Sequence, residues 1–300
     1  MSDGIASNTA KQYSTGQRHY LNFCAQLGVV PCPATELLLL RFVASFNNSV
    51  RGYTVQNYLS AIRHLHVMNG VQNPIPEFER LKLVVKSLKK KSGPPRQRSP
   101  ISISMLKAIC ATLNLRMYNE VLFWAMTVSG FFGFLRVSEF TVSGEFDPVH
   151  HLCRQDLSLA ADFSTCYLQI KTSKTDPFRR GCRIVLGATG DAVCPVLAIL
   201  LYLSRRTQTV GPLFKFANGR PATRNWFCHR LKEAIRAIGF QGDFTSHSLR
   251  IGAATSAAAV GIPHATIQTL GRWTSDSYKL YLRMSDQQKK DSCRRLVSAR

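Results

Sequence analysis

Apolar residues recur at helical spacing in four segments of the first ninety residues, and Gly or Pro separates each segment from the next. The segments cover residues 10–27, 35–46, 53–70 and 78–88. In the third segment, Tyr58, Leu59, Ile62 and Leu65 fall on one stripe. Because such stripes must be buried against one another, the pattern predicts a compact bundle of about four helices.

Beyond residue 100 the pattern stays mostly helical but contains one stretch with a period of two. Helices are expected at 104–115, 119–134, 194–203, 223–238, 245–261 and 263–271. Ser104 is expected to cap the first of them, and Pro263 and Gly271 to mark the first turn and the end of the last. Alternation predicts strands at 165–171 and 182–186, joined by a hairpin turn over 172–177. The predicted fold class is mainly α with a small antiparallel β-sheet (α+β).

A change of composition separates the two regions. The stretch from Lys86 to Arg98 holds six basic residues, no acidic ones and the run Gly93-Pro94-Pro95. We therefore predict a helical domain at 1–89, a basic linker at 90–100 and a second domain at 101–300. The linker suits either a strap across a DNA backbone or a nuclear import signal. Its candidate DNA-binding residues are Lys89, Lys90, Lys91, Arg96 and Arg98.

The charge points to a polyanionic partner. The chain carries 39 Lys+Arg against 17 Asp+Glu, a formal net charge of +22. A basic surface tuned for solubility is the less favoured reading, so double-stranded DNA becomes the expected partner. The first hundred residues and the remainder both carry a surplus, which favours a clamp over a basic tail. Nine scattered cysteines without metal-ligand spacing, no signal peptide and no apolar run of membrane length indicate an intracellular protein with no membrane association.

A cluster of polar residues near the C-terminus could bind and attack a phosphate. His247 and Arg250 lie three apart at the head of a predicted helix, the run Gly271-Arg272-Trp273 follows, and Tyr281 comes after it. Arginine and histidine bind phosphate, and tyrosine is a nucleophile that can form a covalent link to phosphorus.

Several motifs together resemble the tyrosine recombinase (integrase) family. They are Leu135-Arg136-Val137-Ser138-Glu139, Lys174 on the hairpin, His247-x-x-Arg250, Gly271-Arg272-Trp273 and Tyr281, in the order and rough spacing of that family. The amino-acid sequences of these motifs are most similar to those of recombinases of eukaryotic mobile elements, of the DIRS-like and Crypton type. The resemblance covers nearly the whole chain, and it implies a helical core-binding (SAM-like) domain followed by a tyrosine recombinase catalytic domain.

The resemblance also implies a role for each motif. Tyr281 would attack the DNA phosphate and form a 3′-phosphotyrosyl link. Arg136 and Arg250 would bind the non-bridging oxygens, with further hydrogen bonds from His247 and Trp273. Lys174 would protonate the leaving oxygen.

The remaining implied role belongs to Glu139, which would hold His247 or an arginine in place. No cofactor is expected. No metal is expected either, because Asp147, Asp156, Asp162 and Asp176 stand apart and two-metal chemistry needs gathered carboxylates.

Three assignments have rivals in the sequence. Lys171 competes with Lys174 as the general acid, although its place within a strand makes it the weaker candidate. Tyr278 competes with Tyr281, but its distance from Trp273 is too short for the family spacing. Family spacing counted back from Tyr281 falls on Arg272, one residue before Trp273, so either residue could face the phosphate. We favour Trp273, because tryptophan occurs at that place in the family.

The predicted function is site-specific DNA recombination without metal or ATP, serving integration or excision of a mobile element. The family resemblance implies a homo-tetramer on DNA, with the segment after Tyr281 docking on a neighbouring protomer. It implies a nuclear protein, or a cytoplasmic one if the source is prokaryotic. A type IB topoisomerase uses similar chemistry and is the alternative within the same class. A domesticated, catalytically silent DNA-binding protein of the same fold is the alternative from another class.

Overall fold

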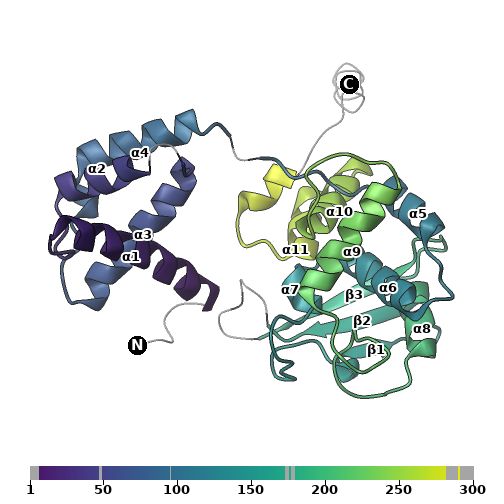
Figure 1. Ribbon diagram of the computed structural model, residues 1–300. Helices are drawn as coiled ribbons and strands as arrows, with labels where there is room; N and C mark the ends of the chain where they lie inside the picture. Colours follow the sequence, from purple (N-terminus) through teal and green to yellow (C-terminus); the bar gives the residue numbers. More distant parts are fainter. Residues whose placement is uncertain are drawn as a thin grey trace. The chain divides into compact units, whose positions relative to one another are not determined.

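A computed structural model describes residues 7–46, 49–94, 96–172, 176, 180–281 and 290. The chain divides into two compact units, residues 1–96 and residues 97–300, each with a hydrophobic core of its own. The fold is mainly helical with a small antiparallel sheet, as the sequence pattern predicted (Figure 1). In the part of the chain that the structure describes, no helix is long and apolar enough to cross a membrane.

The first unit contains the four predicted helices. They are α1 (Ser7–Leu27), α2 (Glu36–Ser45), α3 (Gly52–Met68) and α4 (Glu79–Lys91), with the short 3₁₀ helix η2 (Ile75–Glu77) before α4. Tyr20, Phe42 and Ile62 are fully buried at the centre of the unit. Helices α1 and α3 cross closely at Gly16, where an added Cβ would lie 2.8 Å from the Cβ of Ala61.

Helix α4 is longer than the sequence pattern predicted. It ends at Lys91, so Lys89, Lys90 and Lys91 form its last turn and are not part of an extended linker. Three cations in a last turn are favourable there, because the C-terminal end of a helix carries partial negative charge. At the other end of the predicted linker, Ser99 N–H donates to Asp243 O at 3.0 Å, and residues 97–100 belong to the second unit.

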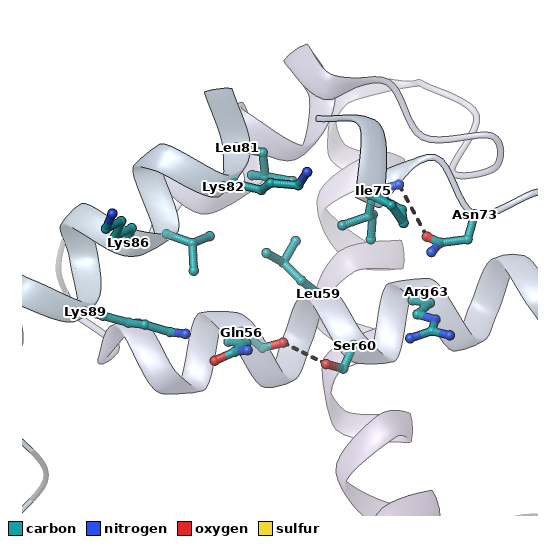
Figure 2. A pocket seen from close by; sticks show the side chains of 12 residues that line it. Gln56, Leu59, Ser60, Arg63, Asn73, Ile75, Leu81, Lys82, Lys86 and Lys89 are labelled. Carbon is teal, nitrogen blue, oxygen red and sulfur yellow. Dashed lines mark hydrogen bonds between the residues drawn. The ribbon is translucent and has the colours of Figure 1, made fainter. Parts of the chain in front are cut away.

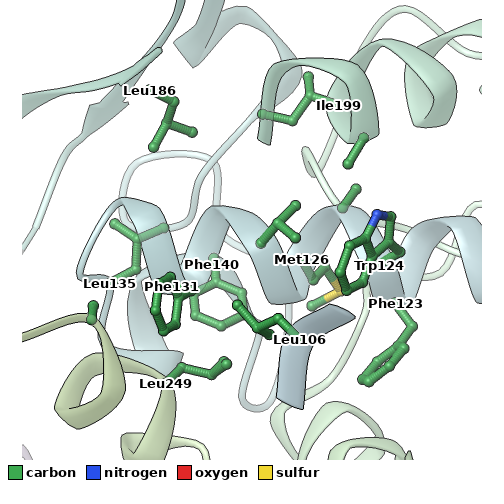
Figure 3. Packing of buried hydrophobic residues seen from close by; sticks show 14 of the residues in the cluster. Leu106, Phe123, Trp124, Met126, Phe131, Leu135, Phe140, Leu186, Ile199 and Leu249 are labelled. Atoms are coloured by element: carbon green, nitrogen blue, oxygen red, sulfur yellow. The ribbon is translucent and has the colours of Figure 1, made fainter. Parts of the chain in front are cut away.

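The second unit is built around α6 (Tyr118–Phe132), where every residue from Val121 to Phe131 is buried. Figure 3 shows its side chains packed against Leu106, Ile199 and Leu249 from neighbouring helices. Those three residues belong to α5 (Ile103–Thr112), α8 (Pro195–Arg205) and α10 (His247–Ala259), and α9 (Arg224–Ala237) also packs on α6, with Phe227 against Phe123. The N-cap of α5 is Ser102, not Ser104, because the Ser102 hydroxyl accepts the Met105 N–H.

The three-stranded sheet runs in the order β1-β2-β3 and is antiparallel throughout. The predicted strands are β2 (Thr165–Ile170) and β3 (Cys182–Gly187), which pair with Tyr167 opposite Val185. The sequence pattern missed β1 (Leu157–Leu159), because three residues are too few to show an alternation. The short 3₁₀ helix η3 (Arg154–Asp156) precedes it. The predicted turn at 172–177 and the last fifteen residues lie largely outside the described residues.

Three short elements complete the unit and carry much of the candidate site. They are α7 (Val137–Phe140), α11 (His264–Gly271) and the 3₁₀ helix η4 (Asp276–Tyr281). Pro263 is the N-cap of α11 and does not lie in its first turn. Arg272, not Gly271, ends α11 in the left-handed conformation, with φ of 54°.

The chain enters the second unit by crossing α10 at very short range. The Ile101 N–H donates to Ser248 O at 3.1 Å, and Gly252 lies directly beneath the crossing. A Cβ on Gly252 would come within 1.8 Å of the Ile101 carbonyl oxygen. Only glycine therefore allows the entering segment to pack on the helix that carries His247 and Arg250.

Candidate active site

Two arginines bind opposite oxygens of one buried carboxylate. Arg136 Nη1 lies 3.0 Å from Glu139 Oε1, and Arg272 Nη2 lies 2.7 Å from Glu139 Oε2. The Arg136 backbone N–H also donates to this carboxylate at 2.9 Å, because Arg136 is the N-cap of α7 and Glu139 stands three residues into it. Of the two partners expected for Glu139, an arginine and His247, the structure shows bonds to arginines.

Arg250 is nearly fully buried, with 1% of its surface exposed. Its Nη1 donates to Phe134 O at 2.7 Å and its Nη2 donates to Gly271 O, which uses two of its five N–H groups. Burial, and then the nearby charges of Arg136 and Arg272, lower the pKa of Arg250 to about 9, so it remains a cation at neutral pH. The site thus holds a desolvated positive charge among other positive charges.

His247 and Tyr281 are in direct contact. The Nε2 atom of His247 lies 2.9 Å from the Tyr281 hydroxyl, and the two ring centroids are 5.4 Å apart. Burial, and then the charges of Arg98, Arg250 and Arg136, lower the pKa of His247 to about 4. The imidazole is therefore neutral at pH 7, and Nε2 can accept the phenolic proton of Tyr281. The Thr255 hydroxyl donates to Tyr281 O at 2.7 Å and fixes the tyrosine backbone to α10.

Trp273 packs between the buried arginine and the tyrosines. Its ring lies 4.4 Å from the Arg250 guanidinium carbon, 5.8 Å from the Tyr281 ring and 6.1 Å from the Tyr278 ring. Gly271 makes this fold possible, because a Cβ there would come within 1.7 Å of the Trp273 ring. The run Gly271-Arg272-Trp273 is thus a compact turn in which the ring of Trp273 packs directly against Gly271.

The two candidate tyrosines have different environments. Tyr278 is 5% exposed, belongs to the hydrophobic core of the second unit and packs against Trp273 and His264. Tyr281 is half-buried, and its hydroxyl lies on His247. The hydrogen-bonded hydroxyl beside the arginines is that of Tyr281.

The two candidate lysines are not equally well described. Lys171 Nζ lies 2.7 Å from Asp156 Oδ2 and donates to Pro148 O at 2.8 Å. Although burial acts to lower it, the pKa of Lys171 is raised by its hydrogen bonds with Asp156 and Cys153. An ammonium group held in this way is a poor proton donor. Lys174 lies outside the described residues.

Arg272 takes part in the site in a way that the sequence reasoning did not foresee. Besides the bond to Glu139, its Nη2 donates to Phe134 O at 3.2 Å, and its Nη1 contacts the Cys182 sulfur at 3.5 Å. The Phe134 carbonyl, presented by a residue with φ of 48°, accepts from both Arg250 and Arg272. In the sequence, this turn at Phe134 was indicated by the run Gly133-Phe134 after an apolar helix.

The candidate DNA-binding residues lie on the surface of their own units. Lys90, Lys91, Arg96 and Arg98 are exposed, and Lys89 is half-buried over the Tyr53 ring. In the first unit, a groove of about 420 Å³ between α3 and α4 is lined by apolar side chains that include Leu59, Ile75 and Leu81 (Figure 2). Its rim carries the cations Arg63, Lys82, Lys86 and Lys89. Among the described residues, no group of three or more His, Cys, Asp or Glu side chains could hold a metal ion.

The chain resembles known proteins along most of its length, although no family model matches it. It is 24% identical over 283 residues to the integrase/recombinase xerD homologue of Selenomonas ruminantium, which covers 90% of this chain and 80% of the relative. The structure is similar to the XerH site-specific recombinase bound to difH in a post-cleavage complex. That match has a TM-score of 0.67 and 13% identity, and it covers 94% of this chain and 78% of the other.

Two further structures share the fold. The Tn1549 transposon integrase bound to transposon right end DNA matches with a TM-score of 0.64 and 13% identity, over 98% of this chain and 95% of the other. A lambda integrase dimer bound to a COC′ core site matches with a TM-score of 0.58 and 17% identity, over 93% and 90%. At these identities the structural matches establish the fold of both units.

Proposed function

We propose that the chain is a tyrosine recombinase (integrase), as its similarity to an integrase/recombinase xerD homologue suggests, and that it cleaves and rejoins double-stranded DNA through a 3′-phosphotyrosyl intermediate on Tyr281. The observation that carries the proposal is the 2.9 Å contact between the Tyr281 hydroxyl and a neutral His247, close to the buried guanidinium group of Arg250. A nucleophile, a proton acceptor and a cationic site for the phosphate are thus close together.

The proposed cleavage step uses these groups in a balanced sequence. His247 Nε2 takes the phenolic proton while Tyr281 Oη attacks the phosphorus. The bond between phosphorus and the 5′ oxygen breaks, and the leaving oxygen takes a proton from Lys174. Arg136 and Arg250 bind the non-bridging oxygens, where charge accumulates in the transition state. The burial of Arg250 supports this role, because charges act more strongly where water is excluded.

Lys174 is proposed as the general acid because its rival is already engaged. Lys171 is held by Asp156 and by the Pro148 carbonyl, and these contacts would have to break before it could reach DNA. Rejoining reverses the first step. The 5′ hydroxyl attacks the phosphotyrosyl bond, which has kept the bond energy, so the proposed reaction needs neither ATP nor metal.

The biological role is proposed at a finer level than the family. Integration or excision of a mobile element fits both the xerD homologue and the fold shared with a transposon integrase. The proposed likeness to DIRS-like and Crypton recombinases, and with it a nuclear location, rests on the amino-acid sequences of the motifs alone. In the first unit, the cationic rim of the α3–α4 groove and the last turn of α4 are proposed to bind the DNA backbone.

Assembly as a homo-tetramer on DNA is part of the proposal. In the second unit, an apolar groove of about 300 Å³ lies among Phe131, Phe132, Ala257, Val260 and Leu270. Val260 at its edge is 77% exposed and Leu270 is 43% exposed, so the groove is open to an apolar side chain from outside. The C-terminal segment of a neighbouring protomer is the proposed occupant.

A covalent trapping assay tests the proposed chemistry. A library of randomised duplexes, each nicked so that the cleaved fragment escapes, is incubated with the full chain, and DNA covalently attached to protein is selected. We expect adduct from the unmutated protein and a loss of at least about 1,000-fold for Tyr281→Phe, with DNA binding retained. Tyr278→Phe is the matched control and should keep adduct formation within about threefold.

The outcomes separate the alternatives. Adduct from Tyr281→Phe but not from Tyr278→Phe would show that the nucleophile is misassigned. DNA binding with no adduct from any duplex, including the terminal repeats of the encoding element, would favour a catalytically silent DNA-binding protein.

The general acid has its own test. Lys174→Ala should be slow on ordinary DNA, and replacing the 5′ bridging oxygen by sulfur should restore its rate, because a thiolate leaves without a proton. Lys171→Ala is the control, and it should show no selective restoration. The opposite pattern would assign the acid to Lys171.

A further inference from the structure

The turn that follows α11 contains a cation whose side chain faces other protein groups. Arg272 is 14% exposed in its side chain, and its terminal nitrogens contact Glu139, the Phe134 carbonyl and the Cys182 sulfur. Its Nε is buried and has no hydrogen-bond partner among the described residues. Family spacing counted back from Tyr281 falls on Arg272, although Trp273 is the residue favoured to face the phosphate.

Backbone and side-chain contacts together hold the conformation of Arg272. Arg272 is left-handed, with φ of 54° and ψ of 45°, where a residue other than glycine is strained. Such a conformation persists when surrounding contacts determine it. The contacts here are of two kinds. The Arg272 N–H donates to Thr269 O at 3.0 Å and the Trp273 N–H to Gln268 O at 3.1 Å, and the Arg272 side chain bonds to the Glu139 carboxylate and the Phe134 carbonyl.

Glu139 connects this arginine to another. One carboxylate oxygen binds Arg272 and the other binds Arg136, and the side chain of Glu139 is 2% exposed. A buried carboxylate between two guanidinium groups orients both, so the loss of Arg272 would remove one of the bonds that fix the carboxylate and, through it, the Arg136 side chain. The Phe134 carbonyl, shared by Arg250 and Arg272, makes a second connection of the same kind.

We infer that Arg272 is a positioning residue for DNA cleavage: it acts through Glu139 to hold Arg136 where the phosphate arrives, and it does not itself bind the phosphate. The inference rests on the proposed function. The adjacent Trp273 has a separate task, because its ring covers Arg250 and contacts Tyr281. Neighbouring residues of one turn thus fix different parts of the site.

The first measurement is a double-mutant cycle on the nicked duplex selected with the unmutated protein. Arg272→Gly removes the guanidinium while relieving the left-handed strain, so the backbone of the turn is kept. We expect Arg136→Ala and Arg272→Gly each to slow adduct formation by at least about 100-fold. The double variant should be no more than about threefold slower than Arg136→Ala alone, because both changes remove the same function. If the two rate losses instead multiply in the double variant, Arg272 binds the phosphate itself.

A second substrate distinguishes positioning from general damage. In a methylphosphonate duplex one charged non-bridging oxygen is replaced by methyl, so neutralisation by Arg136 is no longer needed. On this substrate Arg136→Ala and Arg272→Gly should both react within about threefold of the unmutated protein. If Arg272→Gly stays slow while Arg136→Ala recovers, the arginine merely supports the fold around His247 and Tyr281, and the inference fails.

Two controls keep the outcomes apart. Arg272→Lys keeps the charge but cannot contact Glu139, the Phe134 carbonyl and the Cys182 sulfur together, and it should resemble Arg272→Gly. Arg116→Ala changes an exposed arginine before α6 and should leave the rate unchanged. Absence of adduct from the unmutated protein would overturn the proposed function, whereas adduct with multiplying losses would overturn only the positioning role.

Discussion

Single residues in this site hold charge in unfavourable surroundings before any DNA is bound. Arg250 is nearly inaccessible to water, and Arg136 and Arg272 close to it are paired with one carboxylate, that of Glu139. Backbone carbonyls of Phe134 and Gly271 compensate part of the lost hydration. A phosphodiester would supply negative charge to a site already arranged for it, which is how electrostatic preorganisation lowers a barrier.

The protonation of His247 should make stability depend on pH. Its folded pKa of about 4 lies below the ordinary value of about 6.5 for an unfolded chain. As the pH falls from 7 towards 4, the unfolded chain binds a proton that the folded chain excludes. The free energy of unfolding should therefore fall, by at most about 1.4 kcal/mol per pH unit for this one proton.

Urea unfolding of the full chain at several pH values measures this effect. His247→Gln should show a shallower decline between about pH 7 and pH 4.5 than the unmutated protein. His264→Gln alters an exposed histidine at the start of α11 and should leave the decline unchanged. Equal slopes for His247→Gln and the unmutated protein would contradict the lowered pKa.

Some contacts of single residues could be read from the sequence and others could not. Arg136 and Glu139 are three apart, so their pairing follows from local helical geometry. The Arg272–Glu139 pair joins residues 133 positions apart, and no local pattern indicates it. The side-chain conformation that places the Tyr281 hydroxyl on His247 is likewise a property of the packed structure.

At the scale of elements, α10 connects the parts of the site. It carries His247 and Arg250, receives the Ile101 segment at Gly252 and is bonded through Thr255 to Tyr281. Its sequence is rich in small residues, with Ala253, Ala254 and Ala257 buried. The small side chains allow neighbouring segments to approach the helix closely enough for these contacts.

Gly252→Ala should be strongly destabilising, although alanine normally favours a helix by about 1 kcal/mol. The new methyl group would lie 1.8 Å from the Ile101 carbonyl oxygen, which is backbone and cannot rotate away. We expect a loss of about 3 kcal/mol in the free energy of unfolding, seen as a lower Tm.

Gly187→Ala is the matched control for this substitution. Gly187 ends β3, and nothing lies within 4 Å of the position that its Cβ would take. Its Tm should change little. If Gly252→Ala were equally harmless, the close crossing of α10 by residue 101 would be incorrect.

Most elements were predictable, and the errors fall at their ends. Apolar stripes located the helices of the first unit and α6, because burial of one face requires the corresponding spacing. The ends depend on caps and charges that compete within a few residues, as for Ser102 against Ser104 and for the lysines that extend α4. The strand β1 is defined by its pairing with β2 rather than by its own sequence.

At the scale of the whole molecule, both units carry a positive surplus, and the fold class follows from patterning alone. DNA binding should therefore depend steeply on salt. Each phosphate contact contributes a slope of about −0.9 to the plot of log K against log salt concentration. Replacing Lys89, Lys90 and Lys91 by alanine should flatten the slope by up to about 2.7.

Titrations of a fluorescent duplex at increasing NaCl concentrations measure this slope. The triple Lys→Arg variant keeps the charges and should retain the slope of the unmutated protein. An unchanged slope in the alanine variant would show that the last turn of α4 does not contact DNA.

The crossing at Gly252 also determines how this protein could be re-engineered. Residues 99–101 make backbone hydrogen bonds to Asp243 and Ser248 of the second unit, so they are a structural part of that unit and not of a flexible linker. A chimera that exchanged the first unit for another DNA-reading module, such as a zinc-finger array, would have to be fused before residue 97. A junction placed at residue 101, where composition alone would put it, would remove part of the segment that lies across α10.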